Sequence, residues 1–486
     1  MKRFLAALTV VTLILTCTAQ SQQYGSTDFH ASGDPEAHVL FIRGLVMLHN
    51  FEYEDARETF RQARNLDPDF VMAYWGEALT HEHPLWNQQN LAAARAVLNQ
   101  LAPTAEARVE KAQTEREKAY VRSVNILFGE GDARERDYAY SAALKTISET
   151  WPEDIDAGAL YALSVLTVSH DGRDFYKFMR AGAITEELMD KAPGHPGALH
   201  YNIHSYDDPV HAPLGRRAAD VYSEIAPAAV HALHMPSHIY FALGDYDRAG
   251  DLNARSFQAA LERIREKNIP YNGQAYHSLS WLIYSHLQGG RFDEARRLVG
   301  IAEQEWKNSD TPVNRIGFIT CRSNYIIDTQ AWDDPLLDLE VSHDKVWPSI
   351  IAMDQYIMGM RALHQGDTRK AGAIVAAFVR SPNPDSKAIR AAAPTVLKLL
   401  LEGRLLIAEG DSEKGLALMQ EAVDLEQPLA PAIGPAMPQP AAEALADAYL
   451  QIGQPDQARE NYKLSLTRAV NRRRSVEGLK ASGGVS

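Results

Sequence analysis

Histidines are the residues of this chain whose number and spacing point most directly to chemistry. Nine of the 17 histidines among the 486 residues lie between residues 195 and 286. His200 and His204 are four residues apart, as are His234 and His238, and on a helix this spacing places both rings of a pair on one face. Neutral imidazole nitrogen is a preferred ligand of zinc, copper and iron. The spacing therefore predicts a binding site in this region, with a metal ion as the first candidate ligand.

The metal hypothesis assigns to one divalent zinc, copper or iron ion the ligands His200, His204, His234, His238 and His277. Asp207 or Asp208 would then orient a ligand or act as a general base. The alternative is that these histidines bond to the backbone, to tyrosine or to the aspartates, or recognise a peptide, without any metal. The sequence contains no H-E-x-x-H motif, glycine-rich phosphate loop, nucleophile elbow or dinucleotide fingerprint. Whether the protein is an enzyme is therefore left open.

Helical repeats are the elements that must position these side chains. Residues 37–70 fit a 34-residue helix-turn-helix unit, with the small residues Gly44 and Ala56 where its two helices approach each other. The turn at residues 244–249 recurs almost unchanged at residues 290–295, and weaker copies follow later in the chain. One such unit cannot bury its apolar face alone, so neighbouring units must stack.

This pattern resembles the tetratricopeptide repeat, and the resemblance covers most of residues 37–470. The segments 194–201 and 234–240 also resemble a group of exported bacterial tetratricopeptide proteins and, more faintly, tetratricopeptide repeat protein 38. The resemblance implies an all-α fold, a right-handed superhelical α-solenoid of helix-turn-helix repeats. It also implies a scaffold whose concave groove binds a peptide or a protein partner.

In tetratricopeptide repeats a fixed set of first-helix positions faces the groove, and this family geometry implies which side chains line it here. Three consecutive repeats would turn the five metal candidates and His231 toward the groove. The resemblance also implies a ligand-binding groove formed by His231, Tyr240, Ser280, Tyr284, Gln288, Asp207, Asp208 and Trp75. Pro236 falls inside the first helix of its repeat, so that helix should kink or restart there.

A second polar cluster lies at residues 74–86. Glu77 occupies a packing position, and a buried carboxylate needs a partner. His81 is four residues further along the same helical face and is the expected partner. The functional alternative is that the superhelix curls until this wall faces the later histidines.

The first residues have the features of an export signal. Lys2 and Arg3 precede an apolar stretch at residues 4–15, which is too short to span a membrane, and small residues follow up to Ala19. We therefore expect residues 1–19 to be a signal peptide and the protein to be periplasmic or secreted. The alternative is a lipoprotein signal, with a lipid anchor on Cys17 and the protein at the outer membrane.

The expected organisation divides the remaining chain into four parts. Residues 20–36 would be a polar linker, residues 37–300 a solenoid with the histidine-lined groove, residues 301–470 a second solenoid, and residues 471–486 a basic flexible tail. The net charge of −14 and the pI near 5.7 argue against a nucleic-acid or anionic-membrane ligand. A protein or peptide partner is the expected ligand.

Overall fold

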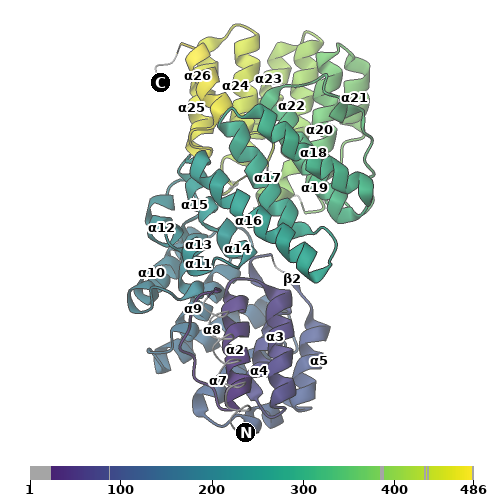
Figure 1. Cartoon of the computed structure of the whole chain (residues 1–486). Coiled ribbons are helices and arrows are strands. Elements are labelled where there is room, and N and C mark those ends of the chain that lie inside the picture. Colours follow the sequence, from purple (N-terminus) through teal and green to yellow (C-terminus); the bar gives the residue numbers. More distant parts are fainter. Residues whose placement is uncertain (1–22, 87, 384–387, 432–433, 435–436, 484–486) are drawn as a thin grey trace. The chain divides into compact units, whose positions relative to one another are not determined.

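The structure, a computed structural model, describes residues 23–86, 88–383, 388–431, 434 and 437–483. Helices follow one another as antiparallel pairs along the chain (Figure 1), and the sheet found among these residues is a two-stranded antiparallel hairpin. This is the all-α solenoid that the repeat spacing predicts. The expected signal segment 1–19, with Cys17, lies outside the described residues. None of the described helices combines the length and the apolar character needed to cross a membrane.

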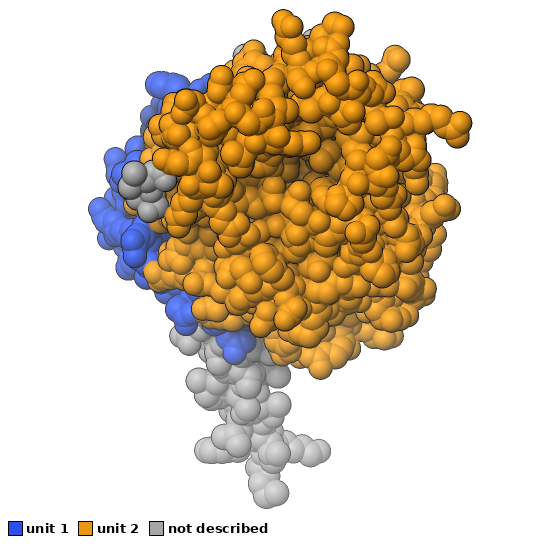
Figure 2. All heavy atoms as spheres, turned by 90° about the horizontal axis from the view of Figure 1, so that it is seen from above, with its two compact units in different colours: residues 1–170, 174–206, 214–236 blue, residues 171–173, 207–213, 237–486 orange. Residues whose placement is uncertain are grey.

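The chain forms two compact units, each described by itself and coloured separately in Figure 2. Unit 1 comprises Met1–His170, Asp174–Tyr206 and Leu214–Pro236, and unit 2 comprises Asp171–Arg173, Asp207–Pro213 and Ser237–Ser486. The boundary expected between residues 300 and 301 is wrong, because it falls inside α18 (Phe292–Asn308), a continuous helix with one buried face.

The elements of unit 1 are mostly helices of two to five turns. They are α2 (Pro35–His49), α3 (Tyr53–Leu66), α4 (Val71–Leu79), β1 (Glu82–His83), η1 (Pro84–Trp86), β2 (Gln88–Gln89), α5 (Leu91–Leu101), α6 (Ala105–Lys111), α7 (Glu115–Leu127), α8 (Ala133–Thr150), α9 (Ile155–Thr167), α10 (Phe175–Lys191), α11 (Pro196–Tyr206), most of α12 (Ala212–Ala219), α13 (Tyr222–Ile225) and α14 (Val230–His234).

Unit 2 is also built mostly from helices. Besides α18 it contains α15 (Pro236–Ala242, from its second residue), α16 (Tyr246–Lys267), α17 (Gly273–Gln288), α19 (Pro312–Thr329), η2 (Pro335–Asp338), α20 (Pro348–His364), α21 (Thr368–Ala376), α22 (Ile389–Ala408), α23 (Ser412–Glu426), α24 (Ala441–Gln451), α25 (Pro455–Arg468) and α26 (Arg473–Ala481). The helix does restart at Pro236, as expected, because α14 ends at His234 and α15 begins at Pro236.

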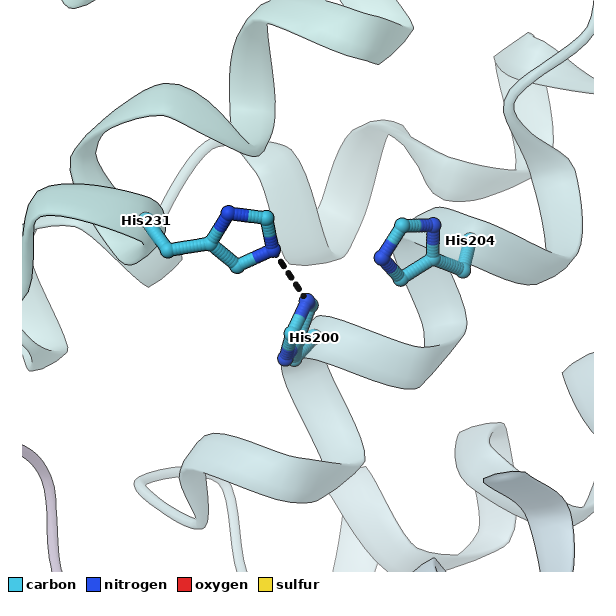
Figure 3. Close-up of side chains that lie close together, drawn as sticks. All are labelled: His200, His204 and His231. Carbon is cyan, nitrogen blue, oxygen red and sulfur yellow. Dashed lines mark hydrogen bonds between the residues drawn. The ribbon is translucent and has the colours of Figure 1, made fainter. Parts of the chain in front are cut away.

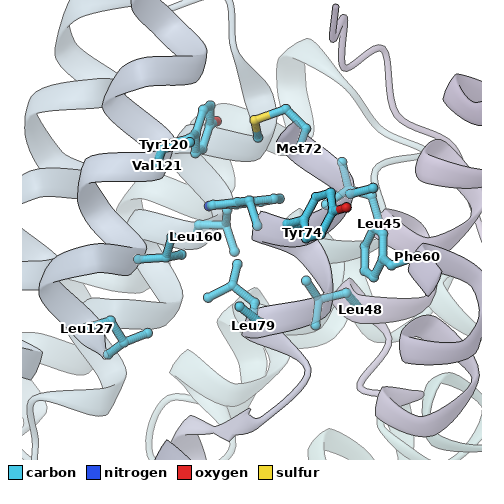
Figure 4. Packing of buried hydrophobic residues seen from close by; sticks show 14 of the residues in the cluster. Leu45, Leu48, Phe60, Met72, Tyr74, Leu79, Tyr120, Val121, Leu127 and Leu160 are labelled. Carbon is cyan, nitrogen blue, oxygen red and sulfur yellow. The ribbon is translucent and has the colours of Figure 1, made fainter. Parts of the chain in front are cut away.

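The core of unit 1 forms where α2, α3 and α4 meet α7 and α9 (Figure 4). Phe60, from α3, is fully buried in this core. A Cβ atom at Gly44 would lie 2.8 Å from the Phe60 ring, and one at Gly76 would lie 2.5 Å from it. Only glycine fits at these two contacts, so the small residue predicted at position 44 is explained by the approach of the Phe60 ring.

Unit 1 also curls back on itself, because α11 packs against α2 as well as against α9 and α10. Gly197 allows this approach, since a Cβ atom there would lie 2.4 Å from Nδ1 of His49. Residues near the end of α2 and residues of α11, about 150 positions apart in sequence, therefore share one site.

The two ends expected to be loose are packed. Phe29, in the expected linker, is 1% exposed and contacts Phe41, Trp75 and Tyr120. Residues 473–481 form α26, and the preceding Arg472 is completely buried. The expectations of a plain linker and of a flexible tail were wrong over the described residues, because both segments carry side chains that the units bury.

Unit 2 closes on itself through this terminal segment. The Tyr246 hydroxyl, at the start of α16, donates a hydrogen bond to the Val470 carbonyl at 2.7 Å, and α26 packs against α17. Arg472 forms ion pairs with Glu443 at 2.8 Å and with Asp328 at 3.1 Å. A hollow is visible on the face of unit 2 shown in Figure 2.

Candidate functional site: a histidine cluster in unit 1

Three histidines of unit 1 point their rings toward one another (Figure 3). His200 and His204 lie one turn apart on α11, and His231 comes from α14. The Nε2 atoms of His200 and His231 are 3.1 Å apart, and one nitrogen from each of the three rings lies within 4.8 Å of the others. The i, i+4 spacing thus brings His200 and His204 together, but the third member is His231, which is predicted to belong to the peptide groove.

The orientation of the His200 ring is set by a backbone group. Its Nδ1 lies 2.7 Å from the carbonyl oxygen of His49, the last residue of α2. A carbonyl only accepts hydrogen bonds, so Nδ1 carries the hydrogen. In neutral His200 the lone pair is therefore on Nε2, the nitrogen that faces His231.

Phe51 packs against all three rings and holds an unusual backbone conformation. Its ring centroid lies 4.3 Å from that of His200, 5.5 Å from that of His231 and 6.1 Å from that of His204. Its φ is +58°, a left-handed value that is rare for a bulky residue.

The later repeats show what normally occupies this turn position. Phe51 and the residue after it form hydrogen bonds to the carbonyls three and five residues earlier in α2, Leu48 and Met47 respectively, and Gly244 and Gly290 begin the same pattern. At the equivalent turns φ is also positive, and the residue is always glycine: Gly244, Gly290, Gly366, Gly410 and Gly453. The first repeat therefore keeps a strained aromatic residue where the others have glycine, and its side chain contacts the cluster.

The cluster is buried on one side and accessible on the other. His200 is completely buried, whereas His204 and His231 are partly exposed. The ring of Trp86, 45% exposed, lies 6.1 Å from that of His231. The backbone N–H of His231 donates to the buried carboxylate of Glu52 at 3.1 Å, which fixes the start of α14.

A neighbouring cluster of unit 1 is a closed hydrogen-bond network. Asp156 accepts hydrogen bonds from Nε2 of His49 at 2.9 Å and from Nε2 of His195 at 3.1 Å. The remaining ring nitrogens bond to the Tyr201 hydroxyl and to the N–H of Ala198. Burial lowers the pKa of His49, and although burial opposes it, the two histidines hold the pKa of Asp156 well below its usual range. Every ring nitrogen has a protein partner, so this cluster is structural.

The other predicted metal ligands lie elsewhere. His234 is buried in unit 1, with its ring 6.1 Å from that of His231. His238 and His277 belong to unit 2 and contact Trp281, on which the His238 ring stacks at 4.6 Å. Burial, followed by the charges of His238 and Arg390, lowers the pKa of His277 to about 3.

The aspartates predicted near the groove are both buried in unit 2 and paired. Asp207 accepts from His238 at 3.0 Å and from Arg173 at 2.5 Å. Asp208 pairs with Arg173 at 3.2 Å and with His211 at 2.9 Å. Both carboxylates are therefore engaged by side chains of unit 2, and their role beside a metal ion stays a prediction.

The remaining predicted groove residues do not line an open surface. Trp75 is 1% exposed in the core of unit 1, and Tyr240 is 1% exposed beneath Arg248. Ser280, Tyr284 and Gln288 are also buried. Two of them are covered by the terminal segment of the chain, because Arg472 donates to the Tyr284 hydroxyl and Gln288 accepts from the backbone N–H of Arg473. The assignment of these residues to an open groove was wrong for this reason.

Glu77 does need a partner, but the partner is not His81. Glu77 is fully buried and pairs with Arg61 at 3.0 Å and with Arg64 at 2.8 Å, both from α3. Because α4 ends at Leu79, His81 leaves the helical face that it was expected to share with Glu77.

Unit 1 also contains an apolar pocket that the histidine spacing does not predict. Most of its wall is aliphatic or aromatic: Leu48, Phe51, Tyr53, Leu79, Pro84, Leu127, Tyr140, Leu160, Leu163 and Tyr201. The hydroxyl residues Ser164 and Thr167 and the acids Glu82 and Asp137 complete it. Burial raises the pKa of Glu82 to about 7, and Asp137 is held by His170 at 2.8 Å. One feature of the sequence could have indicated this pocket. Phe51, which lines it, occupies the first inter-helix turn, where the later repeats have glycine.

Comparisons with known proteins identify tetratricopeptide repeats in two segments of the chain. Residues 276–300 and residues 440–469 each match a family model described as tetratricopeptide repeat. No curated protein matches the chain. Similar solved structures include the Cut9–Hcn1 hetero-tetramer of APC/C (13% identity, TM-score 0.40, covering 99% of this chain and 83% of that one). Yeast Tom70 is another, with 12% identity and a TM-score of 0.34, covering 92% of this chain and 88% of that one. A third is the human IFIT1 dimer with m7Gppp-AAAA, with 13% identity and a TM-score of 0.41, covering 96% of this chain and 92% of that one.

Proposed function

We propose that this chain, a tetratricopeptide-repeat protein with an all-α solenoid fold, is an exported scaffold that binds an extended segment of a partner protein on unit 1. The observation that carries the proposal is the apolar pocket described above, which is lined by the ends of α2, α4, α7 and α9. Repeat solenoids use extended concave surfaces for binding. Protein interaction is also the general role of tetratricopeptide folds.

The lining indicates what the segment should contain. An apolar side chain would be anchored among Leu127, Leu160 and Leu163, because removing it from water supplies the main driving force. Glu82 and Asp137 place carboxyl groups on the same wall, so a hydrogen-bond donor or a basic side chain next to the apolar anchor would be favoured.

The test is a substitution that places a large side chain in the pocket from a residue at its edge. Thr167 ends α9, lines the pocket and is partly exposed, so Thr167→Trp would occupy the pocket with little disturbance to the core. Thr146→Trp is the matched control, because exposed Thr146 on α8 makes the same hydrogen bond to the carbonyl four residues earlier.

Peptides would be selected on the purified chain from a display library and their affinities measured by fluorescence anisotropy. We expect Thr167→Trp to weaken the selected apolar–basic peptides at least about tenfold, roughly 1.4 kcal/mol, and Thr146→Trp to leave them unchanged. Equal binding by both variants, or a library without enriched peptides, would contradict the proposed site.

Export is tested separately. We expect residues 1–19 to be removed and the protein to be recovered from the periplasm or the medium when the full sequence is expressed in a bacterium. Mass spectrometry of the mature N-terminus distinguishes cleavage after Ala19 from acylation at Cys17. Recovery of the uncleaved chain from the cytoplasm would contradict export.

A further inference from the structure

We propose that His200, His204 and His231 form a binding site for one divalent transition-metal ion of the zinc class. The site lies on unit 1, uses three neutral imidazoles and leaves a coordination position for water or another ligand. This ligand set differs from the five histidines that the sequence suggested. The proposal does not depend on the peptide pocket.

The distances fit a shared ion. With metal–nitrogen bonds of about 2.0–2.1 Å in tetrahedral geometry, two ligand nitrogens lie about 3.4 Å apart. The two Nε2 atoms of His200 and His231 are 3.1 Å apart, and all three ligand nitrogens lie within 4.8 Å of one another. The rings already face a common point (Figure 3), so small side-chain rotations would complete the site.

The surroundings of His200 are those of a metal ligand. A histidine that ligates a metal typically donates its other N–H to a carbonyl or carboxylate, which fixes the tautomer and increases the basicity of the ligating nitrogen. His200 does this toward the His49 carbonyl at 2.7 Å. That carbonyl is at the C-terminal, partially negative end of α2, which further favours a cation beyond the ring.

Proximity of ligand atoms does not by itself make a metal site, as the neighbouring Asp156 cluster shows. His49, Asp156 and His195 also bring three ligand atoms within 4.8 Å of one another. There, however, the ring nitrogens bond to Asp156, the Tyr201 hydroxyl and the N–H of Ala198. In the His200 cluster two imidazole nitrogens instead face each other, and an ion can bind between two neutral rings when the hydrogen of His231 moves from Nε2 to Nδ1.

The strained turn at Phe51 supports a selected role for this geometry. A left-handed conformation costs an ordinary residue on the order of 1–2 kcal/mol, and the equivalent turns of the later repeats avoid this cost with glycine. What the chain gains here is an aromatic ring against all three imidazoles. Strain of this kind concentrates at functional sites.

The test uses the full chain, without a polyhistidine tag, stripped with a chelator and dialysed. Co²⁺ is titrated while its visible ligand-field bands are followed, and Zn²⁺ content is measured by elemental analysis after equilibrium dialysis. We expect one ion per chain, with affinity reduced at least about tenfold by His204→Gln and by His231→Gln. His195→Gln, in the structural cluster, should keep the metal and lose stability instead.

A second measurement uses the unmodified chain, so it tests the site even if the histidine variants fail to fold. Diethylpyrocarbonate labels accessible histidines, and we expect Zn²⁺ to protect His204 and His231 but not the exposed His30. Less than about a tenth of an equivalent of metal, far short of a formed site, or full binding by the His204→Gln/His231→Gln double variant, would overturn the proposal. Thr167→Trp should retain the metal and His231→Gln should retain the peptides, so the two proposals fail separately.

Discussion

The imidazole of His200 donates a hydrogen bond to the backbone carbonyl of His49 across 151 residues of sequence. This contact joins α11 to the end of α2 and fixes the tautomer of His200. We expect His200→Leu to remove the donor and destabilise the chain by about 1–3 kcal/mol, besides abolishing metal binding. His231→Gln, which leaves that bond intact, should lose metal with a smaller change in the denaturant midpoint. Equal destabilisation by both variants would contradict this division of roles.

Glycine should suit the backbone conformation of Phe51 but cannot replace the contacts of its ring. Phe51→Gly removes a backbone strain of about 1–2 kcal/mol but also a buried aromatic ring, whose loss typically costs about 3–5 kcal/mol. We therefore expect a net loss of about 2 kcal/mol in urea unfolding, together with weaker Co²⁺ binding. A more stable variant with unchanged Co²⁺ spectra would show that the ring does not organise the histidines.

Asp156 should make the stability of unit 1 sensitive to acid. Burial lowers the pKa of His49 below its unfolded value of 6.5, so below about that pH the unfolded chain binds the extra proton. The pKa of Asp156 is also lowered in the folded chain, so its contribution is present above its unfolded value of 3.8 and is lost as the pH falls further. The midpoint of urea unfolding should therefore fall as the pH drops below about 6.5, through His49, and fall further below about 3.8, through Asp156.

Asp156→Asn tests the same network at neutral pH. The substitution removes the charge that accepts from both imidazoles, and we expect a loss of about 3 kcal/mol in urea unfolding. The exposed Asp132→Asn, at the start of α8, is a matched control that should cost about 1 kcal/mol or less through its capping bonds. Equal losses at the two sites would mean that the buried network contributes little.

The contribution of Glu77 to stability should come from its ion pairs with Arg61 and Arg64 and not from His81. Glu77→Leu would remove the charged acceptor of Arg61 and Arg64, and because half-exposed Arg61 can still be hydrated, we expect a loss of about 2 kcal/mol in thermal or urea unfolding. His81→Gln should change stability by less than about 0.5 kcal/mol, because His81 does not share the Glu77 face. A large effect of His81→Gln would restore the partnership that the sequence suggested.

Arg472 should hold unit 2 closed. Arg472→Gln would leave Glu443 and Asp328 buried with an uncompensated charge, and we expect a loss of about 3–5 kcal/mol and faster proteolysis of the terminal segment. Lys480→Gln, at an exposed position on α26, is the control and should be close to neutral. Unchanged proteolysis of the Arg472 variant would show that the closure does not depend on this residue.

The repeat fold was predictable because its signals are local. Gly44 and Ala56 mark the approach of two adjacent helices, and the glycine turns recur at fixed offsets within each unit. The pairing of His200 with His204 is equally local, since one helical turn brings them to the same face. These features depend on neighbours close in sequence, so the helical period alone is enough to derive them.

The composition of the site was decided by the tertiary structure. The curl of unit 1 brings Phe51 and the His49 carbonyl onto α11. Whether a side chain on the first helix of a repeat is exposed depends on which later segment of the chain packs over it. Arg472 and Arg473 cover Tyr284 and Gln288 although they are more than 180 residues away. No pattern within one repeat encodes such contacts, because they arise from the accumulated rotation of many stacked helices.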